Sequence, residues 1–79
     1  MSERIVTEAE LATWAKKFRK AAGKTRAAAA RELGVSRPSI FEAEECPESS
    51  LFKLRKRIIE KYSTVKVKGP EYRLVMLDS

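Results

Sequence analysis

Two short helix-favouring segments, residues 26–33 and 37–46, lie on either side of a glycine and constrain this chain most strongly. The first segment holds four consecutive alanines, which are strong helix formers, and Thr25 before it suits an N-cap. Gly34 directly after it favours the left-handed conformation that ends many helices. Small alanine side chains also let another helix approach closely. The pattern therefore predicts two helices that cross at a tight turn, a helix-turn-helix.

The second helix of this pair has its own start signal. Ser36 suits an N-cap, and Pro38 lies in the first turn, where a missing backbone N–H costs little. Because Pro38 has no N–H, we expect the Ser36 hydroxyl to accept a hydrogen bond from the amide of Ser39. Ile40 and Ala43 are the expected inward positions of this helix.

A longer helix is predicted near residues 8–22. Thr7 and Glu10 have the spacing of a capping box, in which each side chain accepts from the other residue's amide. Gly23 can end this helix in a left-handed conformation. The apolar positions expected on its inward face are Leu11, Trp14, Ala15, Phe18 and Ala22.

A fourth helix is predicted from about Ser49 to Tyr62. Its apolar residues recur at helical spacing, at Leu51, Phe52, Leu54, Ile58, Ile59 and Tyr62. The basic residues between them are expected to point outward; they are Lys53, Arg55, Lys56, Arg57 and Lys61.

Beyond Ser63 the apolar period changes to two, which is typical of strands. We predict strands near 64–68 and 71–77, joined at Gly69-Pro70. Because a two-stranded hairpin alone is marginal in water, it should pack on the helices or pair with another chain. The expected contacts of such a dimer interface are Val65, Val67, Tyr72, Leu74 and Met76.

The predicted architecture is one mainly α domain spanning residues 1–79. It comprises a helix-turn-helix bundle of four or so helices at 8–62 and a C-terminal β-hairpin at 63–79. A chain of 79 residues has room for a single domain with a small core. No apolar run approaches the roughly 20 residues that cross a bilayer, and the N-terminus lacks the apolar segment of a signal peptide. We therefore expect a cytoplasmic protein that does not contact the membrane.

The residue inventory argues against catalysis. The chain contains no histidine, one cysteine (Cys46) and one aspartate (Asp78), which excludes histidine-based acid–base chemistry and a zinc cage. Its three glycines form no phosphate-binding loop. We expect no enzymatic activity, no cofactor and no bound metal.

The charge of the chain points to an anionic partner. Lys and Arg total 17 against 11 acidic residues, a net charge of +6. A basic balance is typical of proteins that bind nucleic acid, and less often of those that bind anionic membranes. The distribution is uneven, because residues 16–37 and 53–61 are basic whereas 38–48 hold four glutamates and no base. Any functional interpretation must say where this acidic stretch faces.

The residues of the predicted turn also resemble a known family. The stretch Leu33-Gly34-Val35-Ser36-Arg37, with Ser39-Ile40 and Glu44 after it and Phe18-Arg19 before it, resembles the Cro/repressor-type (lambda-repressor-like, XRE) helix-turn-helix DNA-binding family. The similarity covers about residues 8–62. It implies a sequence-specific transcriptional regulator that binds double-stranded DNA as a homodimer on a palindromic operator. Its third helix would be the recognition helix, entering the major groove by its N-terminal end.

The resemblance also implies roles for individual residues. Arg37, Ser39 and Glu42 would contact base edges, with Arg37 suited to guanine and Glu42 to the N4 amine of cytosine. Glu44 would pair with Arg19 and so turn part of the acidic stretch inward. The residues matching the family's phosphate contacts, at or near helix starts, are Thr25, Arg26, Ser36, Ser49, Ser50 and Lys53.

A second interpretation stays open on the same fold. Phe41 stands where the family usually has a polar residue, and it could touch a thymine methyl group, close the core or join a protein interface. With Glu42 beside it and an apolar second strand, the chain could be a protein-interaction module, for example an antitoxin or an adaptor. That function would require a protein partner in place of DNA.

Overall fold

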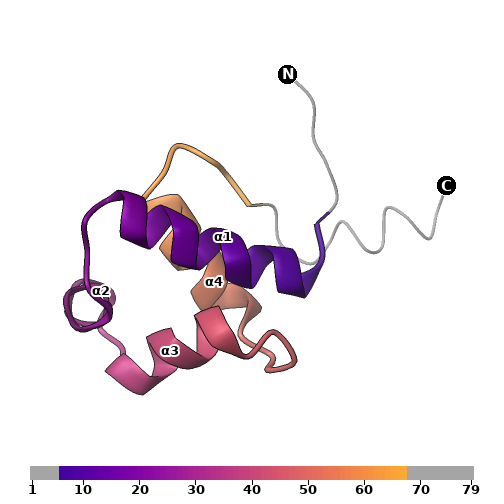
Figure 1. Cartoon of the computed structure of the whole chain (residues 1–79), viewed down its shortest axis with the longest axis horizontal. Coiled ribbons are helices and arrows are strands. Elements are labelled where there is room, and N and C mark those ends of the chain that lie inside the picture. The colour runs from indigo at the N-terminus through magenta and orange to yellow at the C-terminus, as the bar shows by residue number, and fades with distance from the viewer. Residues whose placement is uncertain (1–5, 68–79) are drawn as a thin grey trace, which may run out of the picture.

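The computed structural model describes residues 6–67, which form four helices. The helices are α1 (Glu8–Ala21), α2 (Arg26–Leu33), α3 (Arg37–Glu45) and α4 (Phe52–Lys61). α1 packs chiefly against α4 and α2 against α3, while α3 also contacts α1; α3 lies along the lower edge of the view in Figure 1. Within residues 6–67 there is no strand, and no helix is long and apolar enough to cross a membrane. The prediction of a small, mainly α bundle is confirmed for this part of the chain.

The start and stop signals of the first two helices act as predicted. The amide of Glu10 donates to Thr7 Oγ1 over 3.1 Å, and the amide of Thr7 donates to Glu10 Oε1 over 2.9 Å. Thr25 Oγ1 accepts from the amide of Ala28 at the start of α2. Gly23 and Gly34 have φ angles of +73° and +70°. These left-handed conformations end α1 and α2, and glycine adopts them without strain.

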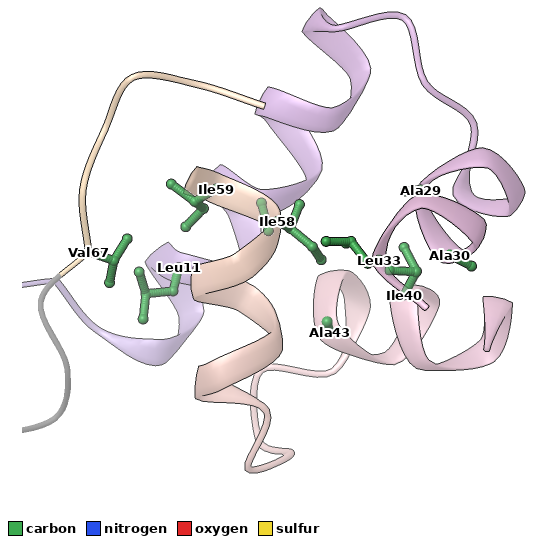
Figure 2. Close-up of a cluster of buried hydrophobic side chains, with 10 residues drawn as sticks. Leu11, Ala29, Ala30, Leu33, Ile40, Ala43, Ile58, Ile59 and Val67 are labelled. Carbon is green, nitrogen blue, oxygen red and sulfur yellow. The ribbon is translucent and has the colours of Figure 1, made fainter. Parts of the chain in front are cut away.

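The hydrophobic core lies where the helices meet (Figure 2). Ala29 of α2 and Ala43 of α3 are fully buried, as expected where small side chains permit close packing. On α1 the buried face is rotated from the predicted one: Ala12 and Arg19 are buried, whereas Trp14 and Phe18 are half-buried and Ala22 is exposed. The core residues are Leu11, Ala15, Ala29, Ala30, Leu33, Ile40, Ala43, Ile58, Ile59 and Val67.

The fourth helix begins later than predicted, at Phe52 rather than near Ser49. Ser49 lies two residues before the N-cap and does not cap the helix; its hydroxyl donates to Glu42 Oε2 over 2.8 Å. Leu51 takes the N-cap position without any side-chain hydrogen bond. The chain from Cys46 to Ser49 forms a turn closed by a 3.0 Å backbone hydrogen bond. Ser49, the predicted first residue of the helix, therefore belongs to this turn instead.

The predicted first strand, 64–68, is wrong over its described residues 64–67. Its amides bond to side chains rather than to a neighbouring strand: Val65 N–H donates to Ser63 Oγ, and Val67 N–H donates to Glu60 Oε2 over 2.8 Å. Val67 is buried near Leu11 and Ile59, as Figure 2 shows, so its side chain packs inside its own chain. The role of Val65 and Val67 in a dimer interface stays a prediction. The second predicted strand, with Tyr72, Leu74 and Met76, lies outside the described residues.

Candidate nucleic-acid interface

α3 has one buried and one exposed face. Ile40, Ala43 and Glu44 are buried against the other helices. The opposite face is exposed and comprises Arg37, Pro38, Phe41, Glu42 and Glu45. We call these five residues the outer face of α3. It includes two of the three predicted base-contacting residues, Arg37 and Glu42, while Ser39 is half-buried at its margin.

The N-terminal end of α3 is held by local hydrogen bonds. The amide of Ser39 donates to Ser36 Oγ over 3.2 Å, as Pro38 requires, and the two serine hydroxyls lie 2.7 Å apart. Arg37 is exposed, and its side chain makes no hydrogen bond or ion pair within residues 6–67. A helix N-terminus carries partial positive charge and unpaired N–H groups, so this end has the polarity that an anion prefers.

The C-terminal end of α3 is held by ion pairs. Glu44, whose side chain is fully buried, accepts from Arg19 Nε over 2.5 Å and from Arg19 Nη2 over 3.0 Å. The ion pair implied by the family resemblance is thus present, and this glutamate faces inward. A third bond comes from Arg26 Nε over 3.0 Å.

Arg26, predicted as a phosphate contact, therefore already has partners in its own chain. Besides Glu44, its Nη2 atom donates to Glu45 Oε2 over 2.7 Å. Its guanidinium carbon lies 4.9 Å from the centre of the Phe41 ring, within cation–π range. Sequence reasoning missed these contacts, because the partners lie 15 to 19 residues away along the chain.

Glu45 is the exposed member of this ion-pair cluster. It accepts from Lys16 Nζ over 2.7 Å as well as from Arg26. The hydrogen bond from Lys16 is the main cause that lowers the pKa of Glu45, and the charges of Lys16, Arg26 and Arg19 lower the pKa further. Its negative charge is therefore matched by cations of α1 and α2.

Arg55 was expected to point outward and is instead completely buried. Its guanidinium donates to the carbonyls of Ala43, Cys46 and Ser49 over 2.8, 2.7 and 2.9 Å. It also pairs with Glu8 of α1, at 2.5 Å. The last carbonyls of a helix have no partner inside that helix; Arg55 supplies donors for that of Ala43 in α3 and for those of Cys46 and Ser49 after it. One signal was present in the sequence, since position 55 lies one turn before Ile58 and Ile59 on the apolar face.

The remaining predicted contacts gather in two hollows. One lies where the first turn of α3 meets the loop before α4, and Ser39, Ser49, Ser50 and Lys53 are among its lining residues. The other is lined by Arg26, Arg37, Pro38 and Phe41. At 100° per residue, Ser39 and Phe41 project on opposite flanks of the outer face. The structure thus groups Ser39, Ser49, Ser50 and Lys53 at one hollow and Arg26 and Arg37 at the other. Thr25 and Ser36 are the N-caps of α2 and α3.

Two acidic side chains belong to the outer face. Glu42 bonds to Ser49 and Glu45 to Lys16 and Arg26, so both are held by partners in the chain. Ordering by partners reduces the side-chain freedom that a ligand would otherwise have to restrict. Glu42 therefore presents a carboxylate, held by Ser49, at the edge of this face nearest Ser39.

No protein-family model, no curated protein and no solved structure matches this chain. The case for its function therefore depends on its residues and their geometry.

Proposed function

We propose that this chain is a sequence-specific DNA-binding regulator of the Cro/repressor helix-turn-helix type, with α3 as its recognition helix. The observation that carries the proposal is the orientation of α3. Its C-terminal end is held by buried arginines, while its first turn faces outward with Arg37 exposed. A helix presented in this way has the diameter and polarity that suit the major groove of DNA.

Base recognition would fall to the outer face and its margin. Arg37 would donate two hydrogen bonds to O6 and N7 of a guanine, since its fork is not engaged elsewhere within residues 6–67. Glu42 would accept from the N4 amine of a cytosine through the carboxylate oxygen that Ser49 leaves open. Ser39 could bond several base edges and would add less preference.

Phosphate contacts would flank this face. Ser50 and Lys53 are exposed beside the first hollow, and Thr25 is exposed at the start of α2. The hydroxyls of Ser36 and Ser49 would contribute from the same side. These contacts would supply most of the affinity and none of the sequence preference. Arg26 could join them only by leaving Glu44 and Glu45, so a positioning role suits it better.

We further propose a homodimer on a palindromic operator. One α3 helix reads only a few base pairs, and two copies related by two-fold symmetry would read half-sites about 34 Å apart. A chain of 79 residues also gains core area by pairing, because small domains bury little surface alone.

Selection of bound sequences from a random duplex pool tests this function. We expect a palindromic sequence, and affinity for it that falls steeply as salt is added. Arg37→Ala should lower preference at one base pair of each half-site by about tenfold, whereas Lys53→Ala should weaken all sequences alike. Lys17→Ala, at an exposed position of α1, is the matched control for lost charge. If no sequence is enriched over the unselected pool at low salt, the proposal is refuted.

One observation favours a protein-interaction module as the second candidate. The outer face carries Glu42 and Glu45 against the single cation Arg37, and such acids weaken non-specific attraction to DNA. A basic partner surface would suit these carboxylates. A stoichiometric complex with a protein partner that Glu42→Lys abolishes, from a chain that selects no DNA, would establish this alternative.

A further inference from the structure

Phe41 is the only large hydrophobic side chain that is exposed within residues 6–67, at 49%. It lies one helical turn after Arg37, on the outer face of α3. Single exposed apolar residues are common on proteins, so its exposure alone indicates nothing. What distinguishes Phe41 is the way its ring is held.

The ring of Phe41 is fixed through a chain of contacts that ends in the core. Arg26 places its guanidinium over the ring, 4.9 Å from its centre. The same guanidinium donates to the buried carboxylate of Glu44 and to Glu45. Because Glu44 is also bonded twice to Arg19, the planar group above the ring has little freedom to move. Contact with this held guanidinium therefore favours one orientation of the exposed Phe41 ring.

The Phe41 ring also borders the second hollow, lined by Arg26, Arg37, Pro38 and Phe41. A phenyl ring and a proline suit a small apolar group, and the exposed guanidinium of Arg37 suits an anionic surface around it. The major-groove edge of DNA offers this combination, because thymine projects a C5-methyl group there and phosphates lie on either side.

We propose that Phe41 contacts the C5-methyl group of a thymine, with Arg26 as the positioning residue that holds its ring. This inference rests on the proposed DNA-binding function. Four residues of α-helix rise about 6 Å, and base pairs are stacked about 3.4 Å apart. The thymine therefore lies within about two base pairs of the guanine that Arg37 contacts.

Replacing thymine by deoxyuridine, one position at a time, in the selected operator tests the contact, since this change removes only the methyl group. For the wild-type chain we expect one position in each half-site where uracil weakens binding about fourfold, the effect of one buried methyl group. Phe41→Ala should bind thymine and uracil equally at that position. Phe41→Leu, which keeps an apolar side chain, should retain part of the difference.

Arg26 requires a readout that separates positioning from charge. Arg26→Lys keeps the positive charge and loses the planar group over the ring, so it should reduce the thymine preference while leaving the salt dependence of binding unchanged. Melting curves of each variant check that it folds. Wild-type binding that is indifferent to uracil everywhere, or a Phe41→Ala variant with the wild-type uracil response, would overturn the inference and leave the DNA-binding function intact. Failure of the pool to yield any operator would overturn both.

Discussion

The two ends of α3 are held by different kinds of interaction. At the C-terminal end, Arg19, Arg26 and Arg55 reach in from α1, α2 and α4 to bond the carboxylates and carbonyls there. At the N-terminal end, α3 is held by the local cap of Ser36 and by the burial of Ile40. One end is fixed by long-range charged contacts, and the other by a local cap and the apolar packing of Ile40.

This difference explains how a short helix can present its first turn to a ligand. A nine-residue helix has little stability of its own, so its position must come from tertiary contacts. Contacts at the N-terminal end would occupy the surface that a ligand needs. Holding the C-terminal end leaves Arg37 and Pro38 exposed while fixing the direction in which they point.

The largest expected effect comes from removing Arg55. Arg55→Met should destabilise the fold by about 3 kcal/mol, because it leaves the carbonyls of Ala43, Cys46 and Ser49 without their donor in a buried site. For a domain of this size the melting temperature should fall by roughly 10–20 °C. Urea denaturation followed by circular dichroism measures the change.

Lys53→Met is the matched control, since it places the same side chain at an exposed position two residues earlier in the chain. Its effect should stay within about 0.5 kcal/mol. If the two variants were equally stable, the carbonyls of Ala43, Cys46 and Ser49 would have found other donors, and the described role of Arg55 would be wrong.

The next largest effect is expected at Glu44. Glu44→Gln keeps an acceptor but removes the charge that pairs with the buried guanidinium of Arg19, which should cost about 2 kcal/mol. The same denaturation experiment measures it. Replacing the two buried members, Glu44→Leu with Arg19→Met, should recover part of the loss, because the partly exposed Arg26 keeps its pair with Glu45 and no fully buried charge is left unpaired. A double variant less stable than Glu44→Gln would contradict this account.

These residues also show what the sequence could predict. The starts of α1, α2 and α3 and the left-handed glycines depend on side chains within four positions of one another, and all were predicted correctly. The burial of Arg55 was not, because a pattern of apolar spacing assigns every charged residue to the outside. The late start of α4 was not either, because Ser49 joins a turn with Cys46 that apolar spacing does not record. A charged residue is stable inside only where another element brings carbonyls to it, which no local pattern records.

The candidate site also contains some features that the local sequence predicts and others that only the folded structure shows. The exposure of Arg37 and Glu42 follows from helical periodicity once the start of α3 is known. The contacts of Arg26 with Phe41, Glu44 and Glu45 join α2 to α3, so they could be identified only from the folded structure.

A smaller effect is expected at the N-terminal end of α3. Ser36→Ala removes the acceptor for the Ser39 amide and should cost about 1 kcal/mol, the usual value of an N-cap. Ser50→Ala, an exposed serine outside any cap in the described chain, should change stability little. A loss at Ser36 as large as that at Arg55, in the same urea denaturation, would remove the contrast between the two ends.

The smallest effect should be the acid response of Glu45. Its folded-state pKa is depressed below the ordinary 4.5, mainly by the hydrogen bond from Lys16. A depressed pKa contributes stability above the unfolded-state value, and that contribution disappears as the pH falls through the folded-state value. The stability of the wild-type chain relative to Glu45→Gln should therefore shrink below about pH 4.5, and the difference should be weaker at high salt because the pair is exposed. Glu48→Gln controls for removing one surface charge, and denaturation at neutral and acidic pH makes the comparison. A difference between wild type and Glu45→Gln that does not change with pH would show that this end of α3 depends on its buried charges alone.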